Sequence, residues 1–212
     1  MVRDQLKARG LRDPELLRAF SIVPRHLFVG GEGVWGEGAY GDHALPLGSG
    51  QTISQPYVVA AMTNAARPPH GWSGAPVLEV GTGSGYQAAI LAELGARVTT
   101  IERYPELAAE AEERLRQAGH GDRVLVLTGD GSRGWPAGAP YRSILVTAAG
   151  PSVPKPLLEQ LDPDDGRLVM PVGTREHQVL TLVRRRDNEF HSRHLDPVVF
   201  VPLIGEHGFA PD

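Results

Sequence analysis

Three glycines at alternate positions, Gly81, Gly83 and Gly85, follow the acidic residue Glu79. Glycine lets a backbone turn sharply and approach a ligand without a Cβ clash. The pattern predicts a loop that holds a nucleotide-type cofactor, against the plainer alternative of a turn that only links two elements. Its spacing differs from the dinucleotide-binding G-x-G-x-x-G, and no Gly-Lys-Ser/Thr follows, which excludes a phosphate-binding P-loop.

Two acidic residues farther along the chain extend this pattern. Glu102 stands about 20 residues after the first glycine, where an acid accepts hydrogen bonds from ribose hydroxyls. An isolated acid at the end of a strand is more often simply solvated. Asp130, followed by Gly131, is suitably placed for an adenine amino group and a close backbone approach. Together these residues predict a site for S-adenosylmethionine.

A third chemical feature is the stretch GSGQTISQPY at residues 48–57, which is too polar for a buried strand. It places Gln51, Thr52, Ser54 and Gln55 immediately before an expected helix that starts at Pro56. On the residues alone, Ser54 is either a functional hydroxyl or the cap of that helix.

The elements that must position these residues alternate between strands and helices. Such alternation predicts an α/β fold with a doubly wound, mainly parallel, seven-stranded Rossmann-like sheet. Two successive final strands predict an antiparallel hairpin at one edge. The expected strands are 76–80, 97–102, 124–130, 143–149, 167–173, 178–186 and 198–203, and the expected helices are 13–20, one from 56 that ends before 68, 86–94, 105–118 and 153–161.

Composition narrows the functional classes. The 212 residues predict one domain, with N-terminal helices, cover and substrate segment over 1–70 and the cofactor-binding core over 75–212. A net charge of −4 offers no basic field for nucleic acid. No signal peptide or membrane-length apolar run is visible, so we expect a cytoplasmic protein. No clear self-association seam appears in the sequence, and a monomer is expected. His191 and His194 lack partners at a metal-binding spacing, and no metal is expected.

The chain resembles the protein-L-isoaspartate O-methyltransferases, a family of class I S-adenosylmethionine-dependent methyltransferases. The resemblance rests on motifs in the family's order over nearly the whole chain: RGLRDPELLRAFSIVPRHLFV, AYGDHALPLGSGQTISQPYVVAAMT, VLEVGTGSGYQAAILAEL, IER, GDGSRGWP, VTAAGPSVP and FVPLIGEHGF. The TISQP segment preceded by LPLG distinguishes this family from other methyltransferases.

The resemblance implies a set of site residues. Ser54 is the implied active-site residue, in a stretch that lines both the cofactor and the substrate pockets. The implied cofactor-binding residues are Gln51, Thr52, Ile53, Ser54, Glu79, Gly81, Thr82, Gly83, Gly85, Glu102, Arg103, Asp130, Gly131 and Thr147. The implied substrate-binding residues are Asp42, Ala44, Leu45, Pro46, Ser54, Val146, Leu203 and Ile204.

The implied reaction is methylation of the α-carboxylate of an L-isoaspartyl residue in a damaged peptide or protein, with S-adenosylhomocysteine as the second product. The ester then re-forms a succinimide that can open to aspartate. One alternative keeps the fold but methylates a normal Asp of a dedicated precursor peptide. A nicotinamide-dependent oxidoreductase conflicts with the glycine spacing, and an inactive binding module conflicts with the presence of Ser54, Glu102 and Asp130.

Three departures from the family's pattern stand out. Arg142 occupies a position where an acid is usual, so the role of that acid is lost or moved. Asp165 with Gly166 replaces a Gly-Gly turn. The glycine-rich stretch 30–38 is either a mobile cover over the substrate or a loose loop.

Overall fold

The structure is a computed structural model that describes residues 1–29, 36–48 and 50–211. Its α-helices are α1 (Pro14–Ile22), α2 (Pro56–Ala66), α3 (Tyr86–Glu93), α4 (Pro105–Gln117) and α5 (Lys155–Glu159). Its strands are β1 (Leu45–Gly48), β2 (Gln51–Ile53), β3 (Pro76–Val80), β4 (Arg97–Glu102), β5 (Val124–Thr128), β6 (Ser143–Val146), β7 (Asp164–Gly173), β8 (Gln178–Arg186) and β9 (Glu189–Val198).

The main sheet has seven strands in the order β5-β4-β3-β6-β7-β8-β9. Strands β5, β4, β3, β6 and β7 pair in parallel, whereas β8 and β9 are antiparallel to their neighbours. The predicted doubly wound sheet with an antiparallel edge hairpin is confirmed. From β3 the chain first builds outward through β4 and β5 and then returns to β6, which makes β3 and β6 the topological switch point.

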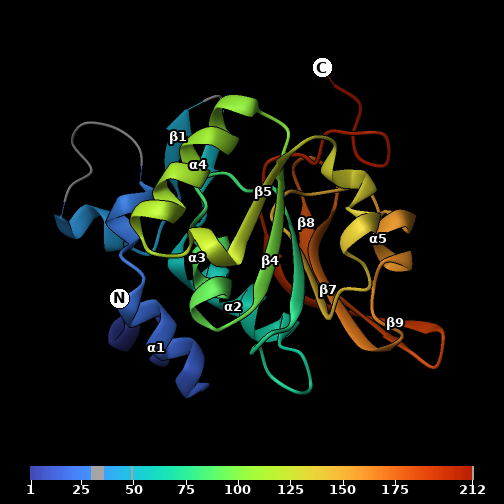
Figure 1. The fold of residues 1–212 in the computed structure, drawn as a ribbon, viewed down its shortest axis with the longest axis horizontal. Coiled ribbons are helices and arrows are strands. Elements are labelled where there is room, and N and C mark those ends of the chain that lie inside the picture. Colours follow the sequence, from blue (N-terminus) through green and yellow to red (C-terminus); the bar gives the residue numbers. More distant parts are fainter. Residues whose placement is uncertain (30–35, 49, 212) are drawn as a thin grey trace.

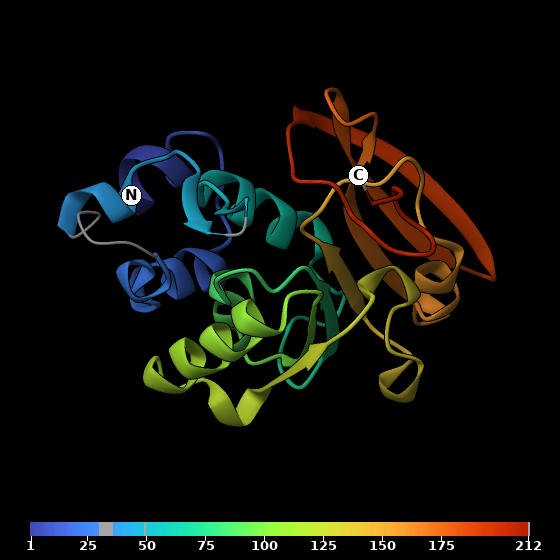
Figure 2. The same cartoon turned by 90° about the horizontal axis from the view of Figure 1, so that it is seen from above.

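The sheet carries a hydrophobic core on each face, because successive residues of a strand point to opposite sides. On β3, Val77 packs into the core that contains α1, α2 and α3, whereas Leu78 packs into the core beneath α5. On β6, Leu145 packs into the first of these cores and Ile144 into the second. Figures 1 and 2 show α3 and α4 on one side of the sheet and α5 on the other.

The N-terminal region packs beside α2 and ends in a small sheet that the sequence pattern did not predict. Strands β1 and β2 pair antiparallel, with Leu45 opposite Ile53, so that both side chains are buried. Helix α2 begins at Pro56 as expected. Its N-terminus is capped from a distance by Asp42, whose carboxylate accepts the Tyr57 N–H at 3.0 Å. The alternative that Ser54 caps this helix is therefore wrong.

The predicted strand 198–203 is also wrong. Strand β9 is Glu189–Val198 and follows β8 through a tight turn at Asp187 and Asn188, which both have positive φ (52° and 63°). Such a two-residue turn matches the twist of paired strands. The segment β9 was missed because it is an edge strand whose side chains are mostly exposed and polar. The residues that follow β9, 199–203, instead turn back toward the carboxyl ends of the parallel strands, where the backbones of Val201 and Leu203 bond that of Ala149.

At two of the three positions that depart from the family's pattern, the side chain has a charged partner. Arg142 forms an ion pair with Asp162 at 3.1 Å. Asp165 adopts a positive φ of 71°, a conformation that usually selects glycine, and its carboxylate binds Arg184 and Arg167. Of the glycine-rich stretch 30–38, residues 30–35 lie outside the described residues.

Within the described ranges, no helix is long and apolar enough to span a membrane. The same ranges contain no group of three or more histidine, cysteine or acidic side chains arranged to hold a metal ion.

Gly85 offers a direct test of how tightly the glycine loop and the helices pack. It precedes α3 with a φ of 88°, and a Cβ there would meet the Leu115 side chain of α4 at 3.3 Å. Gly10 is a matched control, because its φ is 94° and a Cβ would meet nothing within 4 Å. A left-handed conformation costs an L-residue about 1–2 kcal/mol, so Gly10→Ala should lose roughly that much. Gly85→Ala should lose about 1 kcal/mol more in urea unfolding, owing to crowding. Equal losses would contradict this packing.

Candidate active site

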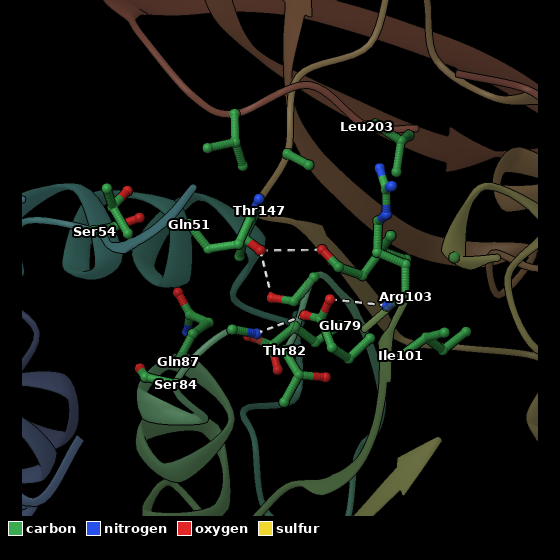
Figure 3. Close-up of a pocket in the computed structure, with 18 of the residues that line it drawn as sticks. Gln51, Ser54, Glu79, Thr82, Ser84, Gln87, Ile101, Arg103, Thr147 and Leu203 are labelled. Atoms are coloured by element: carbon green, nitrogen blue, oxygen red, sulfur yellow. Dashed lines mark hydrogen bonds between the residues drawn. The ribbon is translucent and has the colours of Figure 1, made fainter. Parts of the chain in front are cut away.

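A cleft of about 360 Å³ lies at the carboxyl ends of β3, β4 and β6, within the usual size range of ligand sites. Figure 3 shows Ser54 and Arg103 at opposite sides of the cleft, with Thr147 between them. Twelve of the fourteen predicted cofactor-binding residues line it: Gln51, Thr52, Ile53, Ser54, Glu79, Gly81, Thr82, Gly83, Glu102, Arg103, Gly131 and Thr147.

The glycine loop is fastened to both neighbouring strands. Thr147 lies just after β6, and its hydroxyl donates to the Gly81 carbonyl oxygen at 2.6 Å. The same hydroxyl lies 3.1 Å from the Val80 carbonyl oxygen. A Cβ on Gly81 would collide with that hydroxyl, and Gly81 has a φ of 94°. Glycine is therefore required here for both backbone conformation and space.

Glu102 fixes the other side of the loop. Its Oε2 accepts the Gly83 N–H at 2.9 Å, and its Oε1 accepts the N–H groups of Arg103 and Tyr104 at 2.9 and 3.1 Å. The residue is buried but lines the cleft. A carboxylate has about four lone-pair sites, so Glu102 retains capacity to accept a further hydrogen bond from a ligand.

Glu79 is a fully buried acid at the floor of the cleft. Its Oε2 accepts the Thr100 hydroxyl at 2.6 Å, and Thr100 in turn contacts the Thr82 hydroxyl at 2.7 Å. Burial raises the pKa of Glu79 to about 8, an effect that the Thr100 bond opposes and the nearby Glu102 charge reinforces. Its Oε1 has no hydrogen-bond partner among the described residues. A cationic ligand group would satisfy this oxygen.

A second cavity, of about 700 Å³, adjoins the cleft. The two share four lining residues, Thr52, Ser54, Thr147 and Val201. Tyr57, Val58 and Ala61 of α2 form one wall of the second cavity, and residues 176–180 and 196–201 form the other. The Ser54 hydroxyl has no hydrogen-bond partner among the described residues and stands at the junction. Two ligands could thus meet there.

The predicted substrate-binding residues divide among several environments. Ala44 and Ser54 line the second cavity, whereas Leu203 and Ile204 line the first cleft. Leu45 and Val146 are buried in the two hydrophobic cores, and Pro46 is exposed on β1. The remaining residue, Asp42, caps α2 and pairs with Arg9 at 3.1 Å. Arg9 lines the second cavity and stacks over the Tyr57 ring, 3.3 Å from its centroid.

Two predicted cofactor residues have structural roles and do not line the cleft. Gly85 allows α3 to approach α4. The Asp130 carboxylate accepts hydrogen bonds from the Ser132 N–H, the Ser132 hydroxyl and the Glu206 N–H. Although burial opposes it, these bonds hold the pKa of Asp130 below its usual value. Asp130 thereby anchors the C-terminal segment, in which residues 201–204 and 211 wall the cleft.

Several lining residues escaped the sequence analysis. They are Val59, Met62, Val80, Ser84, Tyr86, Gln87, Ile101, Tyr104, Ala148 and Pro211. Gln87 had a recognisable signal, because it is an amide side chain in the buried part of α3, residues 86–92, whose other members are aliphatic or aromatic. It donates to Thr63 at 2.9 Å, while its Oε1 has no partner among the described residues.

Comparison with known proteins identifies relatives of this chain. The family model for Protein-L-isoaspartate(D-aspartate) O-methyltransferase matches residues 1–208. The curated Protein-L-isoaspartate O-methyltransferase of Methanospirillum hungatei is 51% identical over 212 residues, which are 100% of this chain and 95% of the relative. That of Aeropyrum pernix is 49% identical over 99% of this chain and 80% of the relative.

Solved structures agree with this result. A protein-L-isoaspartate O-methyltransferase superposes with a TM-score of 0.84 at 25% identity, over 98% of this chain and 67% of that one. A Plasmodium falciparum protein described as a putative protein-L-isoaspartate O-methyltransferase, in complex with S-adenosyl-L-homocysteine, has a TM-score of 0.79 at 22% identity, over 96% of both chains. At 22% identity, the likeness to the Plasmodium falciparum structure supports the fold alone.

The raised pKa of Glu79 predicts how stability depends on pH. Between about pH 4.5 and 8 the unfolded chain loses this proton while the folded protein keeps it, so rising pH penalises folding. Glu79→Gln removes the penalty. In the ligand-free protein, its unfolding free energy relative to wild type should therefore grow by more than about 1 kcal/mol between pH 4.5 and 8.5.

Glu113→Gln is the control for this measurement. Glu113 is exposed, and its hydrogen bond with Arg116 lowers its pKa to about 2. Its contribution to stability is lost only as the pH falls below 4.5, so the control should show no trend in the tested window. A pH-independent difference for Glu79→Gln would contradict a protonated Glu79.

Proposed function

The chain belongs to the protein-L-isoaspartate(D-aspartate) O-methyltransferase family, as its motifs predicted, and we propose that it methylates the α-carboxylate of L-isoaspartyl residues in peptides and proteins with S-adenosylmethionine. One observation carries the proposal at the level of the site: the cofactor cleft and the second cavity meet at Ser54 and Thr147. A methyl donor in one and a carboxylate in the other would face each other at this junction.

The lining of the cleft fits S-adenosylmethionine. Glu102 has capacity to accept a ribose hydroxyl, and Gly131 permits a close approach at the adenine end. The orphaned Oε1 atoms of Glu79 and Gln87 are acceptors suited to the ammonium group of the methionine portion. When bound, S-adenosylmethionine supplies an electrophilic methyl group on a sulfonium. Gln51, Thr52 and Ile53 close the cleft on the side of β2.

The proposed role of the second cavity is to orient the acceptor. An isoaspartyl α-carboxylate is ionised at neutral pH and needs no general base. One of its oxygens forms the new bond to the methyl carbon as the carbon–sulfur bond breaks, and the electron pair of that bond stays on sulfur in S-adenosylhomocysteine. The protein must align the two groups and exclude water. The partly buried Ser54 hydroxyl is free to donate to the carboxylate and hold it in line.

Further proposals concern the setting in which the enzyme works. We propose a single methyltransferase domain over 1–212 that acts as a cytoplasmic monomer on isoaspartyl peptides and proteins and does not bind nucleic acid or membranes. The net charge of −4 offers no basic field for a nucleic-acid backbone. The broad, largely apolar second cavity suits varied peptide neighbours of the isoaspartyl residue.

Methyl transfer to matched peptides tests the proposed function. Two peptides should differ only in one residue, L-isoaspartate or L-aspartate, with labelled S-adenosylmethionine as the donor. We expect label in the isoaspartyl peptide alone, because only that linkage presents an α-carboxylate on a side arm of the backbone.

Other outcomes discriminate the alternatives. Transfer to neither peptide, despite measurable binding of S-adenosylmethionine, would refute broad repair and favour a dedicated precursor as substrate. Transfer to the aspartyl peptide would contradict selection of the isoaspartyl linkage.

Replacement of Ser54 tests its proposed contact with the carboxylate. A hydrogen bond to a charged group contributes about 1.5–3 kcal/mol, so Ser54→Ala should lower kcat/KM for the isoaspartyl peptide about 10- to 100-fold. The Kd for S-adenosylmethionine should change far less. Ser21→Ala is the matched control, since the Ser21 hydroxyl bonds only the Leu17 carbonyl within α1. Equal kcat/KM values for the two variants would show that the Ser54 hydroxyl does not contribute to methyl transfer.

A further inference from the structure

Arg25 is the largest fully buried side chain in the described part of the protein, at 0% exposure. It belongs to the motif VPRHLF and forms no wall of either cavity, so neither the cofactor nor the acceptor explains it. A buried guanidinium requires several partners to offset the loss of its hydration. Those partners reveal what the residue does.

The guanidinium joins three other segments of the chain. Its Nη2 donates to the Ser54 carbonyl at 2.8 Å, and its Nε donates to the Ala39 carbonyl at 2.9 Å. Its central carbon lies 4.8 Å from the centroid of the Tyr86 ring. Tyr86 directly follows Gly85 and is the first residue of α3. One side chain therefore contacts both the segment of Ser54 and the helix that begins at the cofactor loop.

The surroundings make this arrangement rigid. The Tyr86 ring is itself packed against Phe20 and Phe28, with centroids 6.1 and 5.7 Å away. Burial lowers the pKa of Arg25, an effect that the Tyr86 hydroxyl opposes, yet a guanidinium remains charged at neutral pH. A planar fork with separate donors can hold two carbonyls at fixed directions, which the single ammonium of lysine cannot do.

We propose that Arg25 is a positioning residue for methyl transfer: it sets where Ser54 stands relative to the cofactor by bonding the Ser54 carbonyl and stacking on Tyr86. Arg25 does not touch the reacting groups. It acts through the backbone of residue 54, while Asp42 and α2 fix the following residues. The inference rests on the proposed function, in which Ser54 orients the acceptor.

The kinetic test compares Arg25→Met and Arg25→Lys. Displacement of a reacting group by about 1 Å costs on the order of 100-fold in rate, so Arg25→Met should lose about 10- to 100-fold in kcat/KM for the isoaspartyl peptide. The Kd for S-adenosylmethionine should change less than kcat/KM, because Arg25 reaches the cleft only through Tyr86 and Ser54, and the other lining residues keep their contacts. Arg25→Lys should recover part of the loss, since one donor can still reach the Ser54 carbonyl.

Arg67→Met is the control for the loss of an arginine that joins separate segments at a partly exposed position. Arg67 follows α2 and pairs with Asp13 at 2.9 Å and Glu15 at 3.1 Å, away from both cavities. All measurements are made below the unfolding transition of every variant. If Arg25→Met matches Arg67→Met in kcat/KM, or loses only cofactor affinity, the positioning role is refuted.

Amide exchange provides a readout that does not depend on the acceptor. We expect faster exchange at residues 51–57 in Arg25→Met than in wild type or Arg67→Met, and unchanged exchange there would overturn the inference. If Arg25→Met does not fold, Arg25→Gln, which keeps one neutral donor, undergoes the same measurements. A wild-type protein that binds S-adenosylmethionine but methylates no isoaspartyl peptide would refute the proposed function, while the exchange result would still decide the role of Arg25.

Discussion

Strands β3 and β6 are hydrogen-bonded neighbours, but the segments that leave their carboxyl ends serve opposite sides of the sheet. This divergence opens a crevice that backbone pairing cannot fill. Thr147 bridges it by bonding the carbonyls of Val80 and Gly81. Thr147 lines the cleft together with the glycine loop, Glu102, the C-terminal segment and the Ser54 segment. The position of the second cavity follows, because it shares Thr147 and Ser54 with the cleft.

The site concentrates polar groups that are costly to bury. Glu79 sits at the floor with one oxygen orphaned among the described residues, and Arg25 lies behind Ser54 with one nitrogen, Nη1, in the same situation. Each has another hydrogen bond to the protein: Thr100 donates to Glu79, and Arg25 donates to the Ser54 carbonyl. Such groups are tolerated when surrounding structure fixes them, and they favour a single arrangement of the loops that they join. A cationic cofactor would relieve the cost at Glu79 and so bind to a site already built for its charge.

Local patterns in the sequence predicted much of this fold and the glycine loop of the cleft, whereas most of the other predicted lining residues came from the resemblance to a known family. The glycine spacing, Glu102 and the polar 48–57 stretch could be recognised in the sequence, because each lies at the end of an expected strand or at the start of an expected helix. Long-range contacts were not accessible in this way. Asp42 caps α2 from a distant segment, Asp130 holds the C-terminal segment, and β9 pairs with β8 although its side chains are mostly exposed. The strand predicted at 198–203 was wrong because β9 ends at Val198, and the residues after it return to the site, where Val201 and Leu203 line the cleft.

The central claim is that the donor and acceptor sites meet at Ser54 and Thr147. A crystal structure with S-adenosylhomocysteine and an isoaspartyl peptide bound together tests it most directly. We expect the cofactor sulfur to point toward Ser54 and Thr147 from the cleft, and the isoaspartyl carboxylate to face it from the second cavity, within reach of the Ser54 hydroxyl. A carboxylate bound elsewhere, with the second cavity vacant, would contradict the account.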